Sequence, residues 1–137
     1  MPNQIFTDGN DTYTVSAAGD YWLGFIGGND TLIVNGGTTT TALMGEGNDI
    51  VTLSAGLATV YGESSADQFG VWAVSATALG GGGNDIFNLR NGSSQSLYGE
   101  AGADRFNFYF NGVDLMLHGG SSNVLFYGND HVISGDI

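Results

Sequence analysis

Apolar residues recur along the chain in short stretches in which they alternate with polar or small residues. Each stretch directly follows an aspartate or its equivalent. Two places after that position stand Tyr13, Leu32, Val51, Phe69, Phe87, Phe106 and Leu125. Four places after it stand Val15, Val34, Leu53, Val71, Leu89, Phe108 and Tyr127. Because alternate side chains of a strand share a face, each stretch predicts a strand with one buried side.

A second strand-like stretch follows about three residues later and ends at a glycine. These glycines are Gly27, Gly45, Gly62, Gly80, Gly99 and Gly119. Two residues before them stand Phe25, Leu43, Val60, Ala78, Leu97 and Leu117, which we interpret as a third inward column. Each repeat therefore predicts a strand, a corner, a second strand and a second corner.

The repeat has a nearly constant length. Asp11, Asp30, Asp49, Asp67, Asp85 and Asp104, with Asn123 in the same place, are separated by 19, 19, 18, 18, 19 and 19 residues. Such a period is typical of a solenoid, in which a coil buries its apolar side only when the next coil stacks on it. The sequence predicts an all-β fold, a parallel β-roll or β-solenoid of about seven coils of 18–19 residues with two short strands per coil.

The 137 residues predict a single domain, with a lead-in at 1–7, repeats at 8–130 and a C-terminal end at 131–137. The 24 glycines and single proline are also compatible with a flexible polymer, but the apolar columns favour a folded stack. The chain has no cysteine, so neither disulfides nor thiolate metal sites are available. No apolar run approaches the length of a membrane span, and no cleaved signal peptide is recognisable.

Charge raises a physical problem for this fold. Fourteen acids face only Arg90 and Arg105, for a formal net charge of −12, which excludes a phosphate-binding surface for nucleic acid. Stacking the coils would bring the periodic aspartates into a column. Two carboxylates roughly 5 Å apart repel by about 3 kcal/mol at an effective dielectric near 20. Without a counter-ion we expect the fold to be weak or absent.

The corner before each first strand supplies carboxylate, amide and main-chain oxygens and no histidine or thiolate. Several hard oxygens at a flexible glycine-rich turn suit Ca²⁺, whereas Mg²⁺ requires a stricter octahedron. One Gly-Asn-Asp cluster would indicate only a turn, but in-register repetition on one edge favours metal. The predicted ligands are Asp11, Asp30, Asp49, Asp67, Asp85, Asp104, Asn10, Asn29, Asn48, Asn84, Gly28, Gly47 and Gly83.

The stretches GGNDTLIV, GEGNDIVTL and GGGGNDIFNL resemble the nonapeptide of RTX (repeats-in-toxin) proteins. The resemblance, which covers about residues 8 to 130, implies a parallel β-roll with calcium between adjacent turns. The second corner here carries no repeating carboxylate, so we expect several ions along one edge only. Asp67 and Asp104 follow corners that lack some of the glycines, which makes these two sites doubtful. Glu63 and Glu100 either supply a second carboxylate there or are solvated surface residues.

The one-edged repeat is also similar to the calcium-dependent solenoid repeats of bacterial ice-binding adhesins, most closely at residues 45 to 62. That resemblance implies a threonine three places before each aspartate. The chain instead has Asp8, Gly27, Glu46, Ser64, Gly82, Ala101 and Gly120 there, so ice binding on this edge is not favoured.

The residues directly before the second-strand glycines predict an outward strip of large apolar and aromatic groups. Its members are Ile26, Met44, Tyr61, Leu79, Tyr98 and His118. An exposed strip of this kind is typical of a contact surface, and we interpret Tyr61, Tyr98, Met44 and Leu79 as partner-binding residues. Alternatively, a neighbouring domain or a slip in the assumed register hides this strip.

No catalytic motif is recognisable, and His131 beside Asp130 is the nearest to an acid–base pair, so we do not expect an enzyme. Two functional hypotheses remain. In the first, the chain is a calcium-binding module of a secreted bacterial protein, exported without a cleaved N-terminal signal and folded by extracellular calcium as a structural or adhesive unit. In the second, it is a recognition module for a carbohydrate or protein partner, or for a second copy of itself.

Overall fold

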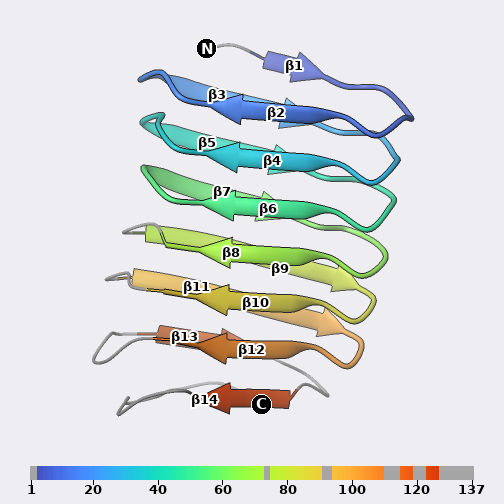
Figure 1. Ribbon diagram of the computed structural model, residues 1–137, viewed down its shortest axis with the longest axis vertical. Helices are drawn as coiled ribbons and strands as arrows, with labels where there is room; N and C mark the ends of the chain where they lie inside the picture. The colour runs from blue at the N-terminus through green and yellow to red at the C-terminus, as the bar shows by residue number, and fades with distance from the viewer. Residues whose placement is uncertain (1–2, 73–74, 91–93, 110–114, 119–122, 127–137) are drawn as a thin grey trace.

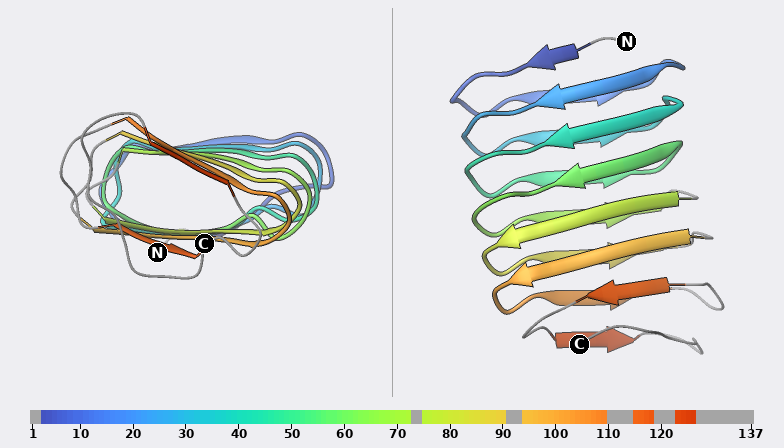
Figure 2. Two further views of the ribbon diagram at one scale, coloured as in Figure 1. Left: turned by 90° about the horizontal axis from the view of Figure 1, so that it is seen from below. Right: turned by 180° about the vertical axis from the view of Figure 1, so that it is seen from behind.

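The computed structural model describes residues 3–72, 75–90, 94–109, 115–118 and 123–126, and all of its regular elements are β-strands. The chain winds in successive coils, each crossing from one sheet to the other and back (Figure 1). Viewed along the stacking axis, the coils superpose as a flattened loop whose two long sides are the sheets (Figure 2). The fold is a parallel β-solenoid with two strands per coil, as the sequence predicted.

The odd-numbered strands form one seven-stranded parallel sheet, here the odd sheet. They are β1 (Asn3–Ile5), β3 (Asp20–Gly24), β5 (Thr39–Leu43), β7 (Leu57–Tyr61), β9 (Ser75–Gly82), β11 (Ser94–Ala101) and β13 (Leu115–His118). The even-numbered strands form the second, here the even sheet. They are β2 (Thr12–Val15), β4 (Thr31–Val34), β6 (Ile50–Leu53), β8 (Gln68–Val71), β10 (Ile86–Leu89), β12 (Arg105–Phe108) and β14 (Asn123–Phe126).

The number of turns differs slightly from the prediction. The described strands complete about five turns rather than seven coils. The solenoid starts with the half-coil β1, and the corners on either side of β13 lie outside the described residues, so strands at both ends do not belong to complete turns.

The even sheet has the register that the sequence predicted. Strands pair with equivalent residues opposite one another, so that Val51 lies against Leu32 and Phe69, and Leu53 against Val34 and Val71. From Leu32 to Phe106 the described side chains of the two inward columns are fully buried. Tyr13 at the N-terminal end is partly buried, and the side chains of Phe108, Leu125 and Tyr127 lie outside the description.

The odd sheet contradicts one residue of the predicted inward column. Leu43 was expected to point inward, but it pairs with Gly24 and Tyr61 on the outer side and is only half-buried, while Met44 is fully buried. The glycine that ends the second strand does not mark a fixed register. Gly27 comes two residues after the inward position of its coil, Gly45 comes one residue after it, and Gly62 occupies it. The first inward column of the odd sheet consists of Leu23, Ala42, Val60, Ala78 and Leu97.

A second inward column of the odd sheet changes from large to small residues along the stack, whereas the even sheet ends in large ones. It runs Phe6, Phe25, Met44, Gly62, Gly80 and Gly99, while the corresponding column of the even sheet runs Tyr13, Leu32, Val51, Phe69, Phe87 and Phe106. The first coils therefore place large groups on the odd side, where Phe6 stacks on Phe25 at 4.2 Å. Later coils place them on the even side, where Phe87 stacks on Phe69 and Phe106 at 4.8 and 4.7 Å. The large side chains of the core thus change from the odd sheet to the even sheet along the stack.

The phenylalanine stack should carry a large share of the core stability. Phe87→Ala leaves a cavity between two rings, and we expect a loss of about 3–5 kcal/mol in the free energy of unfolding. Ile50→Ala, at a side chain that is 48% exposed on the same sheet, should change it by about 0.5 kcal/mol or less. Urea unfolding of both variants in one buffer measures the difference. Equal losses would contradict this assignment of the core.

Candidate functional site

The six predicted aspartates lie at the corners that lead from the odd to the even sheet, on the right of Figure 1. Each stands directly before the first residue of an even strand, so the regular strand pairing fixes its height in the stack. Asp30, Asp49, Asp67, Asp85 and Asp104 are at most 1% exposed. The structure therefore brings five ionisable side chains into a buried column.

One carboxylate oxygen of each buried aspartate joins two coils. The main-chain N–H of an aspartate donates a hydrogen bond to Oδ1 of the aspartate in the next coil. The donors are Asp11, Asp30, Asp49, Asp67 and Asp85, and the acceptors Asp30, Asp49, Asp67, Asp85 and Asp104, at 2.7, 2.7, 2.8, 2.8 and 2.9 Å. We call this arrangement the aspartate ladder. It satisfies a corner N–H that no sheet pairing reaches.

In four of these aspartates the other carboxylate oxygen has no hydrogen-bond partner. Within the described part of the chain, Oδ2 of Asp30, Asp49, Asp67 and Asp85 is buried and unpaired. A buried charged oxygen without a partner is costly, since it has lost its water and gained nothing in exchange. Four such atoms in consecutive coils indicate that something absent from the polypeptide completes them.

Glycines of the odd sheet make room for these carboxylates. A Cβ built on Gly62 would collide with Oδ2 of Asp67, and one on Gly80 with Oδ2 of Asp85. Gly99 stands in the same relation to Asp104. From the sequence these glycines were identified only as strand ends, and their role beside the carboxylates was missed. Their constant place five residues before the aspartate was the available signal.

The asparagines before the aspartates form a second ladder of opposite direction. Oδ1 of Asn10 accepts from the N–H of Asn29 at 2.8 Å, and Oδ1 of Asn29 from Asn48 at 2.9 Å. Asn48 and Asn84 do the same for Ala66 and Ala103, at 3.0 and 2.9 Å. These exposed side chains point along the outside of the corner. The structure thus gives Asn10, Asn29, Asn48 and Asn84 a role in stacking, and the oxygen each would offer a metal is already an acceptor.

The corner backbone places carbonyl oxygens along the stack. Gly28, Gly47, Gly83 and Gly102 have φ between 106° and 144°, which glycine adopts without strain. A Cβ on Gly47 would meet the carbonyl oxygen of Gly28, and one on Gly83 that of Ser65. Main-chain oxygens of each corner therefore approach the glycine of the next one, beside the aspartate ladder.

Asp67 occupies a complete place in the ladder although its corner lacks glycines. Ser65 takes the left-handed conformation at φ 78°, in the position held by Gly47 and Gly83 in the neighbouring coils. A non-glycine residue there costs about 1–3 kcal/mol. The doubt about Asp67 and Asp104 that their sequences raised is not reflected in the geometry, because both side chains are buried and both accept the ladder hydrogen bond.

Glu63 and Glu100 also have positive φ, 77° and 68°, and both are exposed. Glu100 lies close enough to Asp85 to contribute to raising the pKa of that carboxyl. In the described residues, no three acidic, histidine or cysteine side chains converge on one point. An ion in the column would therefore rely on at most two side-chain carboxylates and on main-chain oxygens for the rest.

Burial controls the ionisation of the column. Desolvation raises the pKa of Asp67 to about 8, against the lowering effect of the hydrogen bond from Asp49, and the charges of Asp49 and Asp85 raise it further. Desolvation likewise raises the pKa of Asp49 and of Asp85 to about 6, and it raises the pKa of Asp30. In the metal-free chain these carboxyls therefore lose their protons only at a higher pH than an ordinary aspartate does.

The N-terminal end of the ladder is closed within its own coil. Oδ2 of Asp11 accepts from both the N–H and the hydroxyl of Thr7, each at 2.8 Å. Asp11 is only partly buried. It therefore belongs to the ladder as a donor, while its carboxylate is held locally, unlike the four unpaired carboxylates after it.

The predicted partner strip is corrected in one member. Met44 was expected to be exposed but is fully buried, because the register slip in that coil turns it inward beside Phe25. Tyr61, Leu79 and Tyr98 do form one outward column on the odd sheet. Tyr61 is exposed, and the other two are half-buried. Whether this shortened strip binds a partner stays a prediction.

No family model, curated protein or solved structure matches the chain. Among the described residues, no helix has the length and hydropathy that crossing a membrane requires. The geometry and charge of the aspartate corners are therefore the basis for inferring a function.

A larger residue in place of a glycine tests whether the buried carboxylate needs the space that glycine leaves. Gly62→Ala places a methyl group against Asp67 Oδ2 and the carbonyl of Gly80, and we expect a loss of about 1–3 kcal/mol in the free energy of unfolding. Gly70→Ala is the matched control, because its Cβ would meet only ordinary contacts from 3.7 Å upward. Urea unfolding compares the two. Similar losses would show that Gly62 has no special role.

The pKa values predict how the metal-free chain responds to pH. In the native state the carboxyls of Asp49, Asp67 and Asp85 retain protons that the unfolded chain, with a pKa of 3.8, has released. Raising the pH then favours the unfolded state, so this contribution to stability is complete below about pH 4 and is lost as pH rises through about 6 and about 8.

Urea unfolding of metal-stripped protein between pH 4 and 8 measures this dependence. Asp67→Asn should flatten the part between pH 6 and 8, because the amide does not titrate. Asp20→Asn, at an exposed residue at the start of β3, should leave it unchanged. Stability that is constant or increases over this range in the metal-free parent chain would contradict the prediction.

Proposed function

We propose that this chain is a calcium-binding β-solenoid module, of the RTX type, whose folding depends on the ion. The single observation that supports this most directly is the row of unpaired, buried Oδ2 atoms on Asp30, Asp49, Asp67 and Asp85. A row of buried carboxylates needs positive charge. The chain has only two cationic side chains against fourteen acids.

Those two cations do not serve the column. Arg90 and Arg105 are both exposed, and each stands at an outward position of the even sheet. The neutralising charge must then come from solution, as protons or as metal ions. The raised pKa values of Asp49, Asp67 and Asp85 show how readily protons would serve below neutral pH. As the pH rises through these pKa values the protons are lost, and a divalent cation is then the remaining means of neutralising the column.

The donor set favours calcium among the common cations. Carboxylate Oδ2 atoms from adjacent coils and corner carbonyls are hard oxygen ligands on a glycine-rich backbone, which suits the variable coordination of Ca²⁺ better than the rigid octahedron of Mg²⁺. The ligands would come from Asp30, Asp49, Asp67, Asp85 and Asp104, with carbonyls of corner residues such as Gly28 and Ser65. When bound, the ion supplies positive charge between coils that otherwise repel.

This proposal links folding to location. An ion that binds only the folded state stabilises it by RT ln(1 + [Ca²⁺]/Kd) at each site, about 2.7 kcal/mol at a hundredfold excess over Kd. Several equivalent sites would make the fold weak at low calcium and firm at high calcium. We therefore place the module in a secreted protein that meets calcium outside the cell, where it acts as a stiff structural or adhesive segment rather than as an enzyme.

The test is thermal and urea unfolding at pH 7.5, followed by circular dichroism, with excess calcium, with excess magnesium and with chelator. We expect β structure of high stability in calcium, less in magnesium and least in chelator. Asp85→Asn should remove about 2 kcal/mol or more of the calcium-dependent gain, because it removes a buried ligand. Asp20→Asn changes the same charge at the opposite edge and should keep the gain.

Two outcomes would decide against calcium. Identical stability in calcium and chelator at pH 7.5 would falsify the proposal. Stability that responds to acid but not to calcium would show that the aspartate ladder works as a row of protonated carboxyls instead.

A further inference from the structure

The outer face of the even sheet differs in charge from the rest of the molecule. Its outward positions are the first and third residues of each strand and the residue that follows it. In β6 to β12 they are Ile50, Thr52, Ser54, Gln68, Gly70, Trp72, Ile86, Asn88, Arg90, Arg105, Asn107 and Tyr109. None of the fourteen acids is among them, and both arginines are. A chain of net charge −12 thus presents one face that is neutral to positive.

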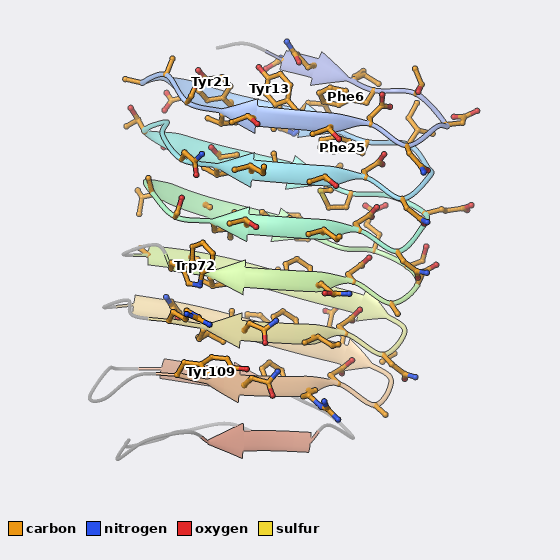
Figure 3. The ribbon with its side chains drawn as sticks, in the orientation of Figure 1. Phe6, Tyr13, Tyr21, Phe25, Trp72 and Tyr109 are labelled. Carbon is orange, nitrogen blue, oxygen red and sulfur yellow. The ribbon has the colours of Figure 1, made fainter. Side chains whose placement is uncertain are left out.

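Three of these side chains form a single column. The N–H groups of Trp72, Arg90 and Tyr109 continue the parallel pairing one residue past β8, β10 and β12 by donating to Leu53, Val71 and Leu89. The three therefore stand in consecutive coils. Trp72 and Tyr109 lie along the edge of the even sheet away from the aspartate corners (Figure 3). The guanidinium of Arg90 lies 5.1 Å from the centre of the Tyr109 ring.

The column borders a shallow groove. Trp72 and Tyr109 are each 45% exposed, which is high for aromatic residues on a regular sheet. A depression of about 270 Å³ lies between them and reaches across the strands to Gln68, Asn88 and Ile50. Gly70 sits in its floor, where the lack of a side chain deepens it. The groove thus combines two aromatic faces, amide groups and a cation.

We propose that this groove binds an extended polysaccharide that carries carboxylate groups. The exposed aromatic rings offer flat apolar surfaces to the C–H faces of sugars, and Gln68 and Asn88 offer hydrogen bonds to hydroxyls. Arg90 pairs with a carboxylate, which its planar guanidinium can bind with two parallel hydrogen bonds while resting on Tyr109.

The spacing of the column fits a linear polymer. Trp72 and Tyr109 are two coils apart, roughly 10 Å along the solenoid axis from the usual strand separation. That distance is comparable to a disaccharide unit in an extended chain, so rings and cation meet alternate sugars of a polymer that runs along the axis. The two arginines, together with the absence of acids from the described outward positions of this sheet, favour an anionic ligand here.

The test uses isothermal titration of the folded chain with short oligogalacturonate, a carboxylated ligand, in calcium and moderate salt. Its methyl-esterified form has the same sugars without the charge. We expect binding of the free acid and at least tenfold weaker binding of the ester, because the ion pair with Arg90 is lost. Sulfated dextran identifies the case in which any polyanion binds.

Matched variants locate the site. Trp72→Ala and Arg90→Gln should each weaken binding of the oligogalacturonate by about tenfold. Arg105→Gln makes the same charge change on the same face, at the other end of the strand, and Trp22→Ala removes an aromatic side chain from the odd sheet; both should bind as the parent does. Circular dichroism in the titration buffer checks that each variant is folded, so a failure of calcium-dependent folding is distinguished from a failure of this site.

Three results would overturn the inference. The first is no binding by the folded parent chain. The second is equal binding of the acid and its ester, or of sulfated dextran. The third is an equal loss in Arg90→Gln and Arg105→Gln, which would indicate a general effect of charge rather than a groove.

Discussion

Stacking coils of equal length places every side chain on its own equivalent, and for the buried aspartates this means like charge on like charge. Apolar columns gain from this arrangement, because identical groups pack with identical spacing. Asp30, Asp49, Asp67 and Asp85 lose by it, since their solvation is removed and their neighbours repel. The aspartate ladder offsets part of the cost by using Oδ1 to accept a main-chain N–H. The unmet requirement of Oδ2 makes the stability of the whole stack depend on conditions in solution.

The remaining structure arranges itself around that requirement. Glycines face the carboxylates in the later coils, where the largest buried side chains are Phe69, Phe87 and Phe106 of the even sheet. In the corner, left-handed backbone angles bring carbonyl oxygens beside the next coil, even where Ser65 replaces glycine. The two opposed ladders, one of aspartate and one of asparagine, tie each coil to both neighbours. The backbone conformation of the corners, the packing of the core and the ionisation of the aspartates therefore depend on one another.

Much of this could be predicted from the sequence. The period of the aspartates predicted the coils, and alternation predicted the inward columns of the even sheet, because a strand has only two faces. The register of the odd sheet was harder to predict, because it was counted from the glycine that ends each second strand. The position of that glycine relative to the inward residues shifts by one between Gly27 and Gly45 and by one again at Gly62. That shift turned Met44 from a predicted surface residue into a buried one. The hydrogen-bonding roles of Oδ1 and Oδ2 were beyond prediction, because they depend on which atom faces which coil. The column of Trp72, Arg90 and Tyr109 was missed because its residues follow the strands and were counted as part of a corner.

The change of side in the core also bears on how such a repeat protein can evolve. Repeats usually multiply by recombination, in which one unit is copied beside another. Here the coils look alike from outside, yet an early coil has its large core group on the odd sheet, as Phe25, and a late coil has it on the even sheet, as Phe87. A crossover inside a coil would combine Phe25 with Phe87 in one coil, or Gly80 with Leu32 in another, so that one coil gained two aromatic rings and the other had none. Duplications that respect whole coils and stay within one half of the stack avoid both faults. The coils are therefore not interchangeable, although they look alike from outside.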